Sequence, residues 1–281
     1  METLWLSTGK EWLKWLLAAN SLVKIGIFLV VWAGLWLPVA LHLKRGQWRS
    51  GLPLTPQTKL PLLATLYAIA PIAIWGAAHL EGRSWAEWGL PGQPQLLLQT
   101  ALGWVLAVGS TLVVLALEGY GGWVQWQREN LPRLWPLLLP VLALALAIGL
   151  VEELVFRGFM LGELQQDYGF WQAAAIASLL FALLHLVWEQ RETLPQLPGL
   201  WVMGMVLSEA YRAGGNLGLA WGLHAGWIWA LTVFKEAGVL VYTGRGPAWL
   251  VGWRELPLAG AVGLLLLLAT GWGLRRFEQG F

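Results

Sequence analysis

The stretch IGLVEELVFRGFM (Ile148–Met160) places two glutamates and an arginine inside a run that is otherwise apolar. An ionisable side chain within a membrane span is costly, and it normally faces the interior of a helix bundle and serves a function. The stretch therefore predicts a membrane helix that carries Glu152, Glu153 and Arg157 toward an internal polar site.

The composition of the whole chain supports a membrane location. Of the 281 residues, 57% are hydrophobic and 12% are charged, whereas soluble domains carry about 25% charged residues. Many of the 22 tryptophans lie near the ends of apolar runs, where amphipathic rings prefer the headgroup region of a bilayer. We therefore expect an integral membrane protein whose main partner is the lipid bilayer.

Two further features of the composition exclude classes of function. The net charge is +2 and the basic residues are scattered among acidic ones, so we expect no nucleic-acid partner. Cysteine is absent, which excludes disulfides, thiolate metal sites and a cysteine nucleophile.

The apolar runs predict an all-α, polytopic transmembrane helix bundle. A spanning helix needs about 20 mainly apolar residues. About eight segments approach this length: Ile25–Leu43, Leu60–Leu80, Leu96–Leu117, Leu134–Phe156, Trp171–Val187, Leu200–Ala213, Leu217–Phe234 and Leu256–Leu274. Before them, residues 1–24 place Trp5, Trp12, Leu13 and Leu16 on one helical face beside Lys10 and Lys14, which favours a helix lying at the membrane interface.

The distribution of basic residues predicts the orientation in the membrane. The loop KRGQWRSGLPLTPQTK contains Lys44, Arg45, Arg49 and Lys59 and no acidic residue, which is typical of a cytoplasmic loop. Alternation then places the loop at Asp167 outside and the segment WEQRET inside. We expect a multi-pass protein of a prokaryotic plasma membrane.

Helix geometry brings three ionisable residues to one depth. If one long helix ends near Gln166 and the next begins at Trp171, then Glu152 and His185 each lie about 16 residues, or roughly 25 Å, from the turn. Glu152 and His185 should therefore meet across an antiparallel hairpin. His224 lies at a similar depth, nearer the face predicted to be cytoplasmic.

The spacing of the two glutamates predicts different environments for them. Glu153 and Arg157 are four residues apart and can pair on a helix, whereas Glu152 points about 100° away. We expect Glu153 and Arg157 to support each other and Glu152 to remain free for chemistry.

One glutamate and two histidines suit two hydrolytic mechanisms. In the first, Zn²⁺ held by Glu152, His185 and His224 activates a water molecule. In the second, which uses no metal, Glu152 deprotonates water and a histidine donates to the developing oxyanion. The sequence is equally compatible with both mechanisms.

Other intramembrane protease chemistries do not fit the chain. Asp167 is the only aspartate, so an aspartyl dyad is excluded. No serine lies in a GxSG motif, and the zinc-binding motif HExxH is absent.

EELVFRG contains the pattern EExxxR, FALLH contains FxxxH, and GLHAGW surrounds a third histidine. These three motifs resemble those of the CPBP family, which comprises CAAX prenyl proteases and bacteriocin-processing relatives. The resemblance covers about residues 134–234 and suggests four regions: residues 1–24 as an interfacial segment, 25–133 as generic spans, 134–255 as a CPBP-like catalytic core, and 256–281 as a final span and tail.

The resemblance implies a role for each motif residue. Glu152 would activate water with help from Glu153, and Arg157 would hold the two glutamates. His185 would position water or a metal, and His224 would stabilise the oxyanion. The implied activity is that of an intramembrane endopeptidase acting on a membrane-associated peptide or protein.

The third motif departs from the family at Ile228, where the family usually has Asn or Asp. An isoleucine has no side-chain donor for an oxyanion, and we consider Asn216 or a backbone amide as a substitute. A non-proteolytic membrane scaffold would tolerate this change and is the first alternative function. A proton-coupled transporter is the second, although the chain has no visible inverted repeat.

Overall fold

The computed structural model describes residues 11–43, 56–187 and 190–279, and within them the chain is almost entirely helical. The longer helices are α2 (Ser21–Leu43), α3 (Pro56–Glu81), α4 (Pro94–Tyr120), α5 (Trp135–Glu153), α7 (Phe170–Leu184), α9 (Leu197–Gly214), α10 (Gly218–Glu236) and α12 (Ala261–Gln279). Shorter helices are α6 (Leu161–Leu164), α8 (Gln190–Thr193) and α11 (Ala248–Val251). The all-α bundle predicted from the sequence is confirmed.

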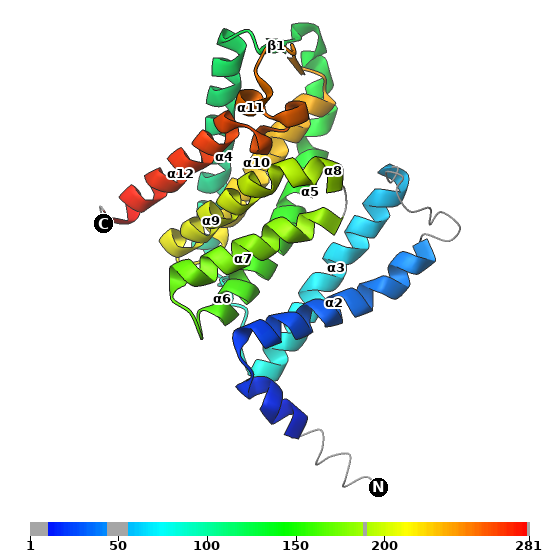
Figure 1. Ribbon diagram of the computed structural model, residues 1–281, viewed down its shortest axis with the longest axis vertical. Coiled ribbons are helices and arrows are strands. Elements are labelled where there is room, and N and C mark those ends of the chain that lie inside the picture. The colour runs from blue at the N-terminus through cyan, green and yellow to red at the C-terminus, as the bar shows by residue number, and fades with distance from the viewer. Residues whose placement is uncertain (1–10, 44–55, 188–189, 280–281) are drawn as a thin grey trace.

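The remaining elements are short turns and one small ribbon. Helical turns occupy Arg128–Leu134, His185–Val187, Leu194–Gln196, Trp253–Glu255 and Pro257–Ala259, and a π-helical segment occupies Leu154–Met160. Strands β1 (Val124–Trp126) and β2 (Leu240–Tyr242) pair antiparallel, with Val124 opposite Tyr242. This ribbon lies at one end of the molecule, beyond α4 and α10 (Figure 1).

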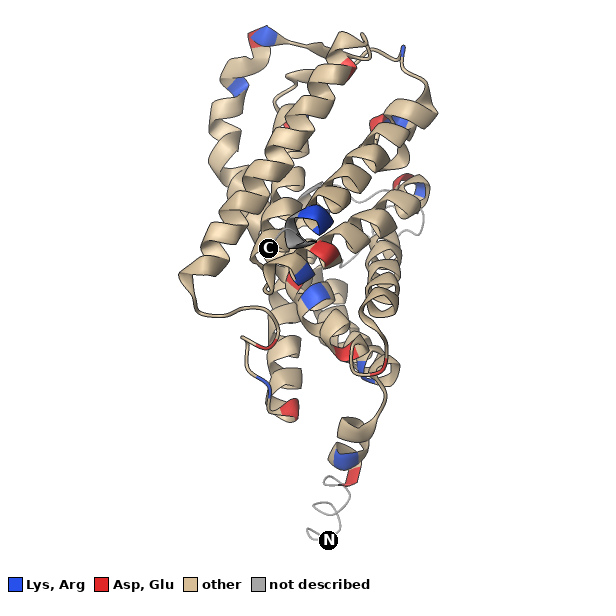
Figure 2. Cartoon of the chain, turned by 90° about the vertical axis from the view of Figure 1, so that its left-hand side faces the viewer, with Lys and Arg blue, Asp and Glu red and all other residues tan. Residues whose placement is uncertain are grey.

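Five helical stretches in the described residues are long and apolar enough to cross a membrane, compared with about eight predicted spans. They are Ser21–Leu43, Gln57–Glu81, Pro94–Tyr120, Arg128–Leu164 and Phe170–Val187. Charged residues are sparse along the described chain, most of which is tan in Figure 2, as a membrane bundle requires.

Three predicted spans are not among these five stretches, and their positions in the structure explain why. Helices α9 and α10 pack inside the bundle, and 11 of the 19 residues of α10 are buried, so they do not need a continuous lipid-facing surface. The last predicted span, Leu256–Leu274, forms a helix only from Ala261, and this helix continues into Arg275, Arg276 and Glu278, so its apolar part is short.

Part of the predicted N-terminal helix lies within the described residues. Residues 11–18 are helical, and Trp12 and Trp15 are exposed. Trp5 and Lys10 lie outside the described residues, as do Lys44, Arg45 and Arg49 of the basic loop. The interfacial position of this helix and the orientation of the chain therefore stay predictions.

Small residues allow α10 to pack very closely against α4. A Cβ atom on Gly222 would lie 2.0 Å from the carbonyl oxygen of Thr100, and one on Gly226 would lie 2.6 Å from Cβ of Ala107. Glycines at such a spacing let membrane helices approach with their backbones nearly in contact. This packing fixes the position of His224, which lies between the two glycines on the same helix.

The hairpin of α2 and α3 is attached to the rest of the bundle through a charged cluster at one end. Lys24 contacts Glu81 at 2.9 Å and Glu163 at 3.1 Å, and Arg83 contacts Glu163 at 3.2 Å. Away from this cluster the hairpin passes beside α5 and α7, as the blue and cyan ribbons in Figure 1 show. One face of the hairpin therefore borders the predicted site.

Candidate active site

Glu152 and Glu153 lie at the end of α5, where the helix passes into the π-helical segment. Single π-helical turns within α-helices are frequent at functional sites. Glu153 is fully buried, and Arg157, inside the π-helical segment, is 1% exposed. The helix thus carries two charges into the core, and each needs a partner there.

Arg157 and Glu153 form the ion pair that their spacing predicts. Nη1 of Arg157 lies 2.8 Å from Oε1 of Glu153. Nη2 of Arg157 donates to the carbonyl oxygen of Gly204 at 3.0 Å, and the guanidinium lies 4.9 Å from the centre of the Phe181 ring. The arginine therefore links α9 and α7 to the glutamates.

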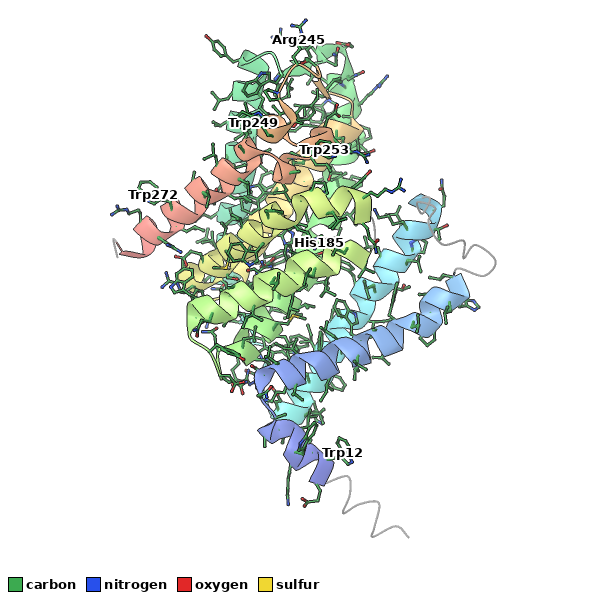
Figure 3. The ribbon with its side chains drawn as sticks, viewed as in Figure 1. Trp12, His185, Arg245, Trp249, Trp253 and Trp272 are labelled. Carbon is green, nitrogen blue, oxygen red and sulfur yellow. The ribbon has the colours of Figure 1, made fainter. Side chains whose placement is uncertain are left out.

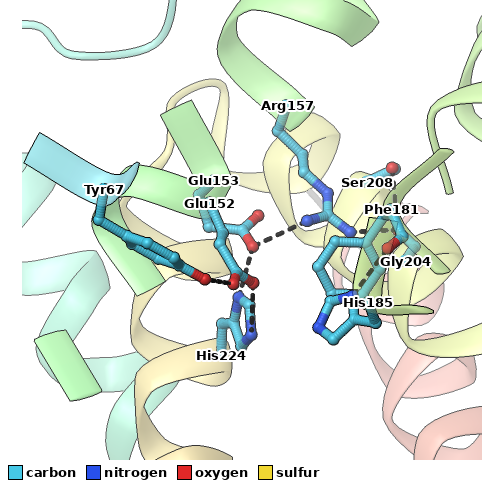
Figure 4. A network of polar contacts seen from close by, with 9 residues as sticks. All are labelled: Tyr67, Glu152, Glu153, Arg157, Phe181, His185, Gly204, Ser208 and His224. Carbon is cyan, nitrogen blue, oxygen red and sulfur yellow. Dashed lines mark hydrogen bonds and ion pairs between the residues drawn. The ribbon is translucent and has the colours of Figure 1, made fainter. Parts of the chain in front are cut away.

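His224, on α10, faces both glutamates. Its Nδ1 lies 2.7 Å from Oε1 of Glu153, and its Nε2 lies 3.5 Å from Oε2 of Glu152. Because an ionised carboxylate only accepts hydrogen bonds, Nδ1 carries the proton in the contact with Glu153. Figure 4 shows the two glutamates and His224 together, with Arg157 reaching toward them.

Glu152 has a further partner that the sequence analysis did not identify. The hydroxyl of Tyr67, on α3, donates to Oε1 of Glu152. Oε2 of Glu152 is buried and receives no hydrogen bond from the described residues. Tyr67 lies in the apolar run LLATLYAIA, so its isolated hydroxyl was a signal that could have identified it.

His185 lies at the end of α7, near the middle of the bundle (Figure 3). Its Nδ1 lies 2.7 Å from the carbonyl oxygen of Phe181, which fixes the proton on Nδ1 and leaves Nε2 as an acceptor. The Phe181 ring also packs edge-on against both histidines, with centroids 4.6 Å from His185 and 5.9 Å from His224. Phe181 thus separates and orients the two imidazoles.

Glu152 and His185 line two cavities. One, of about 330 Å³, is lined by both residues together with His224 and Ile228. The other, of about 470 Å³, lies between the α2–α3 hairpin and α5, and its walls are mainly apolar side chains such as Trp32 and Leu66. Glu152 and His185 are therefore polar groups in the walls of two mainly apolar cavities.

The three residues considered as zinc ligands do not form a ligand set in this arrangement. Catalytic zinc sites normally use three protein ligands, and within the described part of the chain no three His, Asp or Glu side chains converge to hold a metal ion. Of the two histidines, only His224 lies within ion-pair distance of Glu152 among the described residues. The geometry does not fit the zinc alternative, so we derive no reaction step through a metal.

Asn216 does not replace the missing polar residue of the third motif. Its Oδ1 accepts from the backbone N–H of Gly218 at 2.8 Å, and its Nδ2 donates to the carbonyl oxygen of Gly214 at 3.1 Å. These contacts close the turn before α10. Ile228 itself lines the smaller cavity, so the apolar substitution falls at the site.

Part of the chain matches a known protein family. Residues 134–230, about a third of the chain, match the family described as type II CAAX prenyl endopeptidase Rce1-like. The match confirms the resemblance to the CPBP family of CAAX-type proteases, and all five predicted site residues lie within it. No curated protein and no solved structure matches the chain.

Proposed function

We propose that this protein is an intramembrane endopeptidase in which Glu152 activates the attacking water molecule. The observation that carries the proposal is the position of Glu152 in the walls of both cavities. One of its oxygens is held by Tyr67, and the other lacks a hydrogen bond from the described residues. A base held in this way is oriented and still able to accept a proton.

The proposed reaction begins with a water molecule between Glu152 and Nε2 of His224. Glu152 accepts a proton from the water as its oxygen attacks the carbonyl carbon of the peptide bond. Nε2 of His185 accepts a hydrogen bond from the same water and orients it. The proton then passes from Glu152 to the nitrogen of the leaving amine, and the C–N bond breaks.

His224 in its doubly protonated form would stabilise the oxyanion. Nε2 donates to the developing negative charge, while Nδ1 donates to Glu153 and fixes the ring, as an aspartate does for the histidine of a catalytic triad. Arg157 forms an ion pair with Glu153 and keeps this carboxylate in place. Glu153 and Arg157 are thus positioning residues.

The two cavities suggest how a membrane-associated substrate would lie. The apolar cavity beside the α2–α3 hairpin suits an apolar side chain or a lipid group, and the smaller cavity suits the peptide itself. The family description supports a CAAX-type substrate. We expect entry from the cytoplasmic leaflet, because the basic loop predicted to be cytoplasmic adjoins α2 and α3.

Cleavage of a peptide by the purified protein tests the proposal. A farnesylated CAAX peptide with a fluorophore and a quencher, and the same peptide without the lipid, are incubated with wild type and with Glu152→Gln in lipid nanodiscs. We expect Glu152→Gln to abolish cleavage, whereas Glu236→Gln, at the exposed end of α10, should not. Full activity in Glu152→Gln would refute the mechanism.

The same preparation addresses the role of a metal. Measurement of zinc content, with and without His185→Ala, shows whether a metal binds through this residue. Stoichiometric zinc that is lost in His185→Ala, together with activity that depends on it, would replace the metal-free mechanism.

A non-proteolytic scaffold is the second candidate, and Ile228 is the observation that favours it. The apolar side chain lines the cavity beside His224 and offers no donor to an oxyanion. Absence of cleavage in the wild type, with partner binding unchanged in Glu152→Gln, would support the scaffold.

A further inference from the structure

A third carboxylate lies in the wall of the smaller cavity, away from the proposed catalytic residues. Glu118, near the end of α4, is 3% exposed and lines the cavity that also contains Glu152 and His224. Its one side-chain hydrogen bond within the described residues comes from the hydroxyl of Tyr242, at 3.5 Å. No Lys, Arg or His side chain of the described residues pairs with it.

None of the described residues that line this cavity is a lysine or an arginine. The ionisable ones are Glu118, Glu152, His185, His224 and Tyr242. Burial and the nearby carboxylate of Glu118 raise the pKa of Tyr242, so the hydroxyl stays protonated and donates to the glutamate. A buried carboxylate without a cation is costly, and a cationic ligand group would remove this cost.

The packing of α4 against α10 gives the distance from Glu118 to the reacting centre. The two helices run parallel, since Gly222 contacts Thr100 and Gly226 contacts Ala107. His224 is therefore level with residues just before Ala107. From that level to Glu118 is about 13 residues, or roughly 20 Å along the helix. An extended peptide covers this length in about six residues.

We propose that Glu118 is a specificity-determining residue that binds a basic side chain of the substrate, about four to six residues from the scissile bond. The inference rests on the proposed function and names the substrate class: a membrane-anchored peptide with a lysine or arginine near its apolar segment. Such residues are frequent on the cytoplasmic side of membrane segments, and α4 ends on the side predicted to be cytoplasmic.

Position-scanned peptides test the proposal. Each peptide of the series has the same farnesylated CAAX end and one lysine, placed at successive positions, and its partner has norleucine at the same position. Neutral phosphatidylcholine nanodiscs avoid attraction of the peptide to the lipid. Binding is measured by fluorescence anisotropy on Glu152→Gln, and kcat/KM is measured on the wild type.

We expect lysine to be preferred over norleucine at one position by about ten-fold or more, as for a charge-assisted hydrogen bond. Glu118→Gln, which keeps the size and the contact with Tyr242, should bring this ratio close to one. Glu118→Lys should favour glutamate at the same position. Glu129→Gln is the matched control, because it removes the same charge from an exposed residue at the same end of the molecule, and it should keep the preference.

Three outcomes are decisive. A preference that is absent, or that persists in Glu118→Gln, overturns the proposal. A lower unfolding temperature in Glu118→Gln with an unchanged ratio also overturns it, because the residue would then be purely structural. If lysine is preferred in binding through Glu118 but no peptide is cleaved, the inference stands and the endopeptidase proposal fails.

Discussion

The buried ion pair between Glu153 and Arg157 makes a sharp prediction about stability. Arg157→Met keeps most of the volume and the apolar stem of the side chain but removes its charge. Glu153 then loses its ion pair while it is fully buried. The carbonyl of Gly204 also loses its 3.0 Å hydrogen bond. Removal of one partner from a buried pair typically costs about 3–5 kcal/mol, which is about a thousandfold in the unfolding equilibrium.

The double variant Glu153→Gln/Arg157→Met distinguishes the loss of the ion pair from the loss of side-chain packing. With both charges removed, neither member of the pair is left as an unpaired buried charge, and replacement of a whole buried pair is often nearly neutral. We expect the double variant to recover most of the stability, with a coupling energy of at least about 2–3 kcal/mol. The amide side chain that replaces Glu153 in this variant retains an oxygen for the N–H of His224.

Denaturant unfolding in detergent micelles, followed by tryptophan fluorescence, measures these free energies. The matched control is the exposed pair of Lys14 and Glu11, whose side chains are 74% and 71% exposed. Lys14→Met should cost less than about 1 kcal/mol. The reasoning is refuted if Arg157→Met costs no more than this control, or if the two core substitutions are additive.

Three other predictions concern the base, the third motif and pH. Tyr67→Phe should lower kcat/KM about ten-fold, because Glu152 loses a charge-assisted hydrogen bond; an unchanged rate in the peptide assay would contradict this role. Ile228→Asn adds a donor to the cavity and should raise kcat, by up to about 10²-fold; a folded variant with lower kcat would count against the oxyanion argument. The backbone N–H of Ser21 donates to the carboxylate of Asp167 and lowers the pKa of this group. The contact therefore stabilises the fold fully at pH values above the ordinary aspartate pKa. This stabilisation is lost as the pH falls through the lowered pKa. Asp167→Asn should therefore reduce the acid sensitivity of unfolding, and identical pH profiles would contradict the assignment.

The sequence alone determined the class of the protein and most of the proposed site. Long apolar runs and sparse charge are local properties, and the cost of placing charge in lipid does not depend on the details of the fold. Glu152, Glu153, Arg157 and His224 were therefore recognisable as a group, and helix geometry predicted the ion pair. Hydropathy did not determine the number of spans, because a helix buried by its neighbours and a helix facing lipid have similar hydropathy.

Only the tertiary structure decided how the remaining groups meet. Tyr67 contacts Glu152 because ion pairs hold one end of the α2–α3 hairpin against the bundle. The side chain of Asn216 forms its hydrogen bonds within the turn before α10. Glu118 faces the cavity because α4 packs against α10 through glycines. These contacts depend on the rotation of each helix about its axis and on which helices are neighbours. Both result from the packing of the whole bundle, and the spacing of residues along the chain does not fix them.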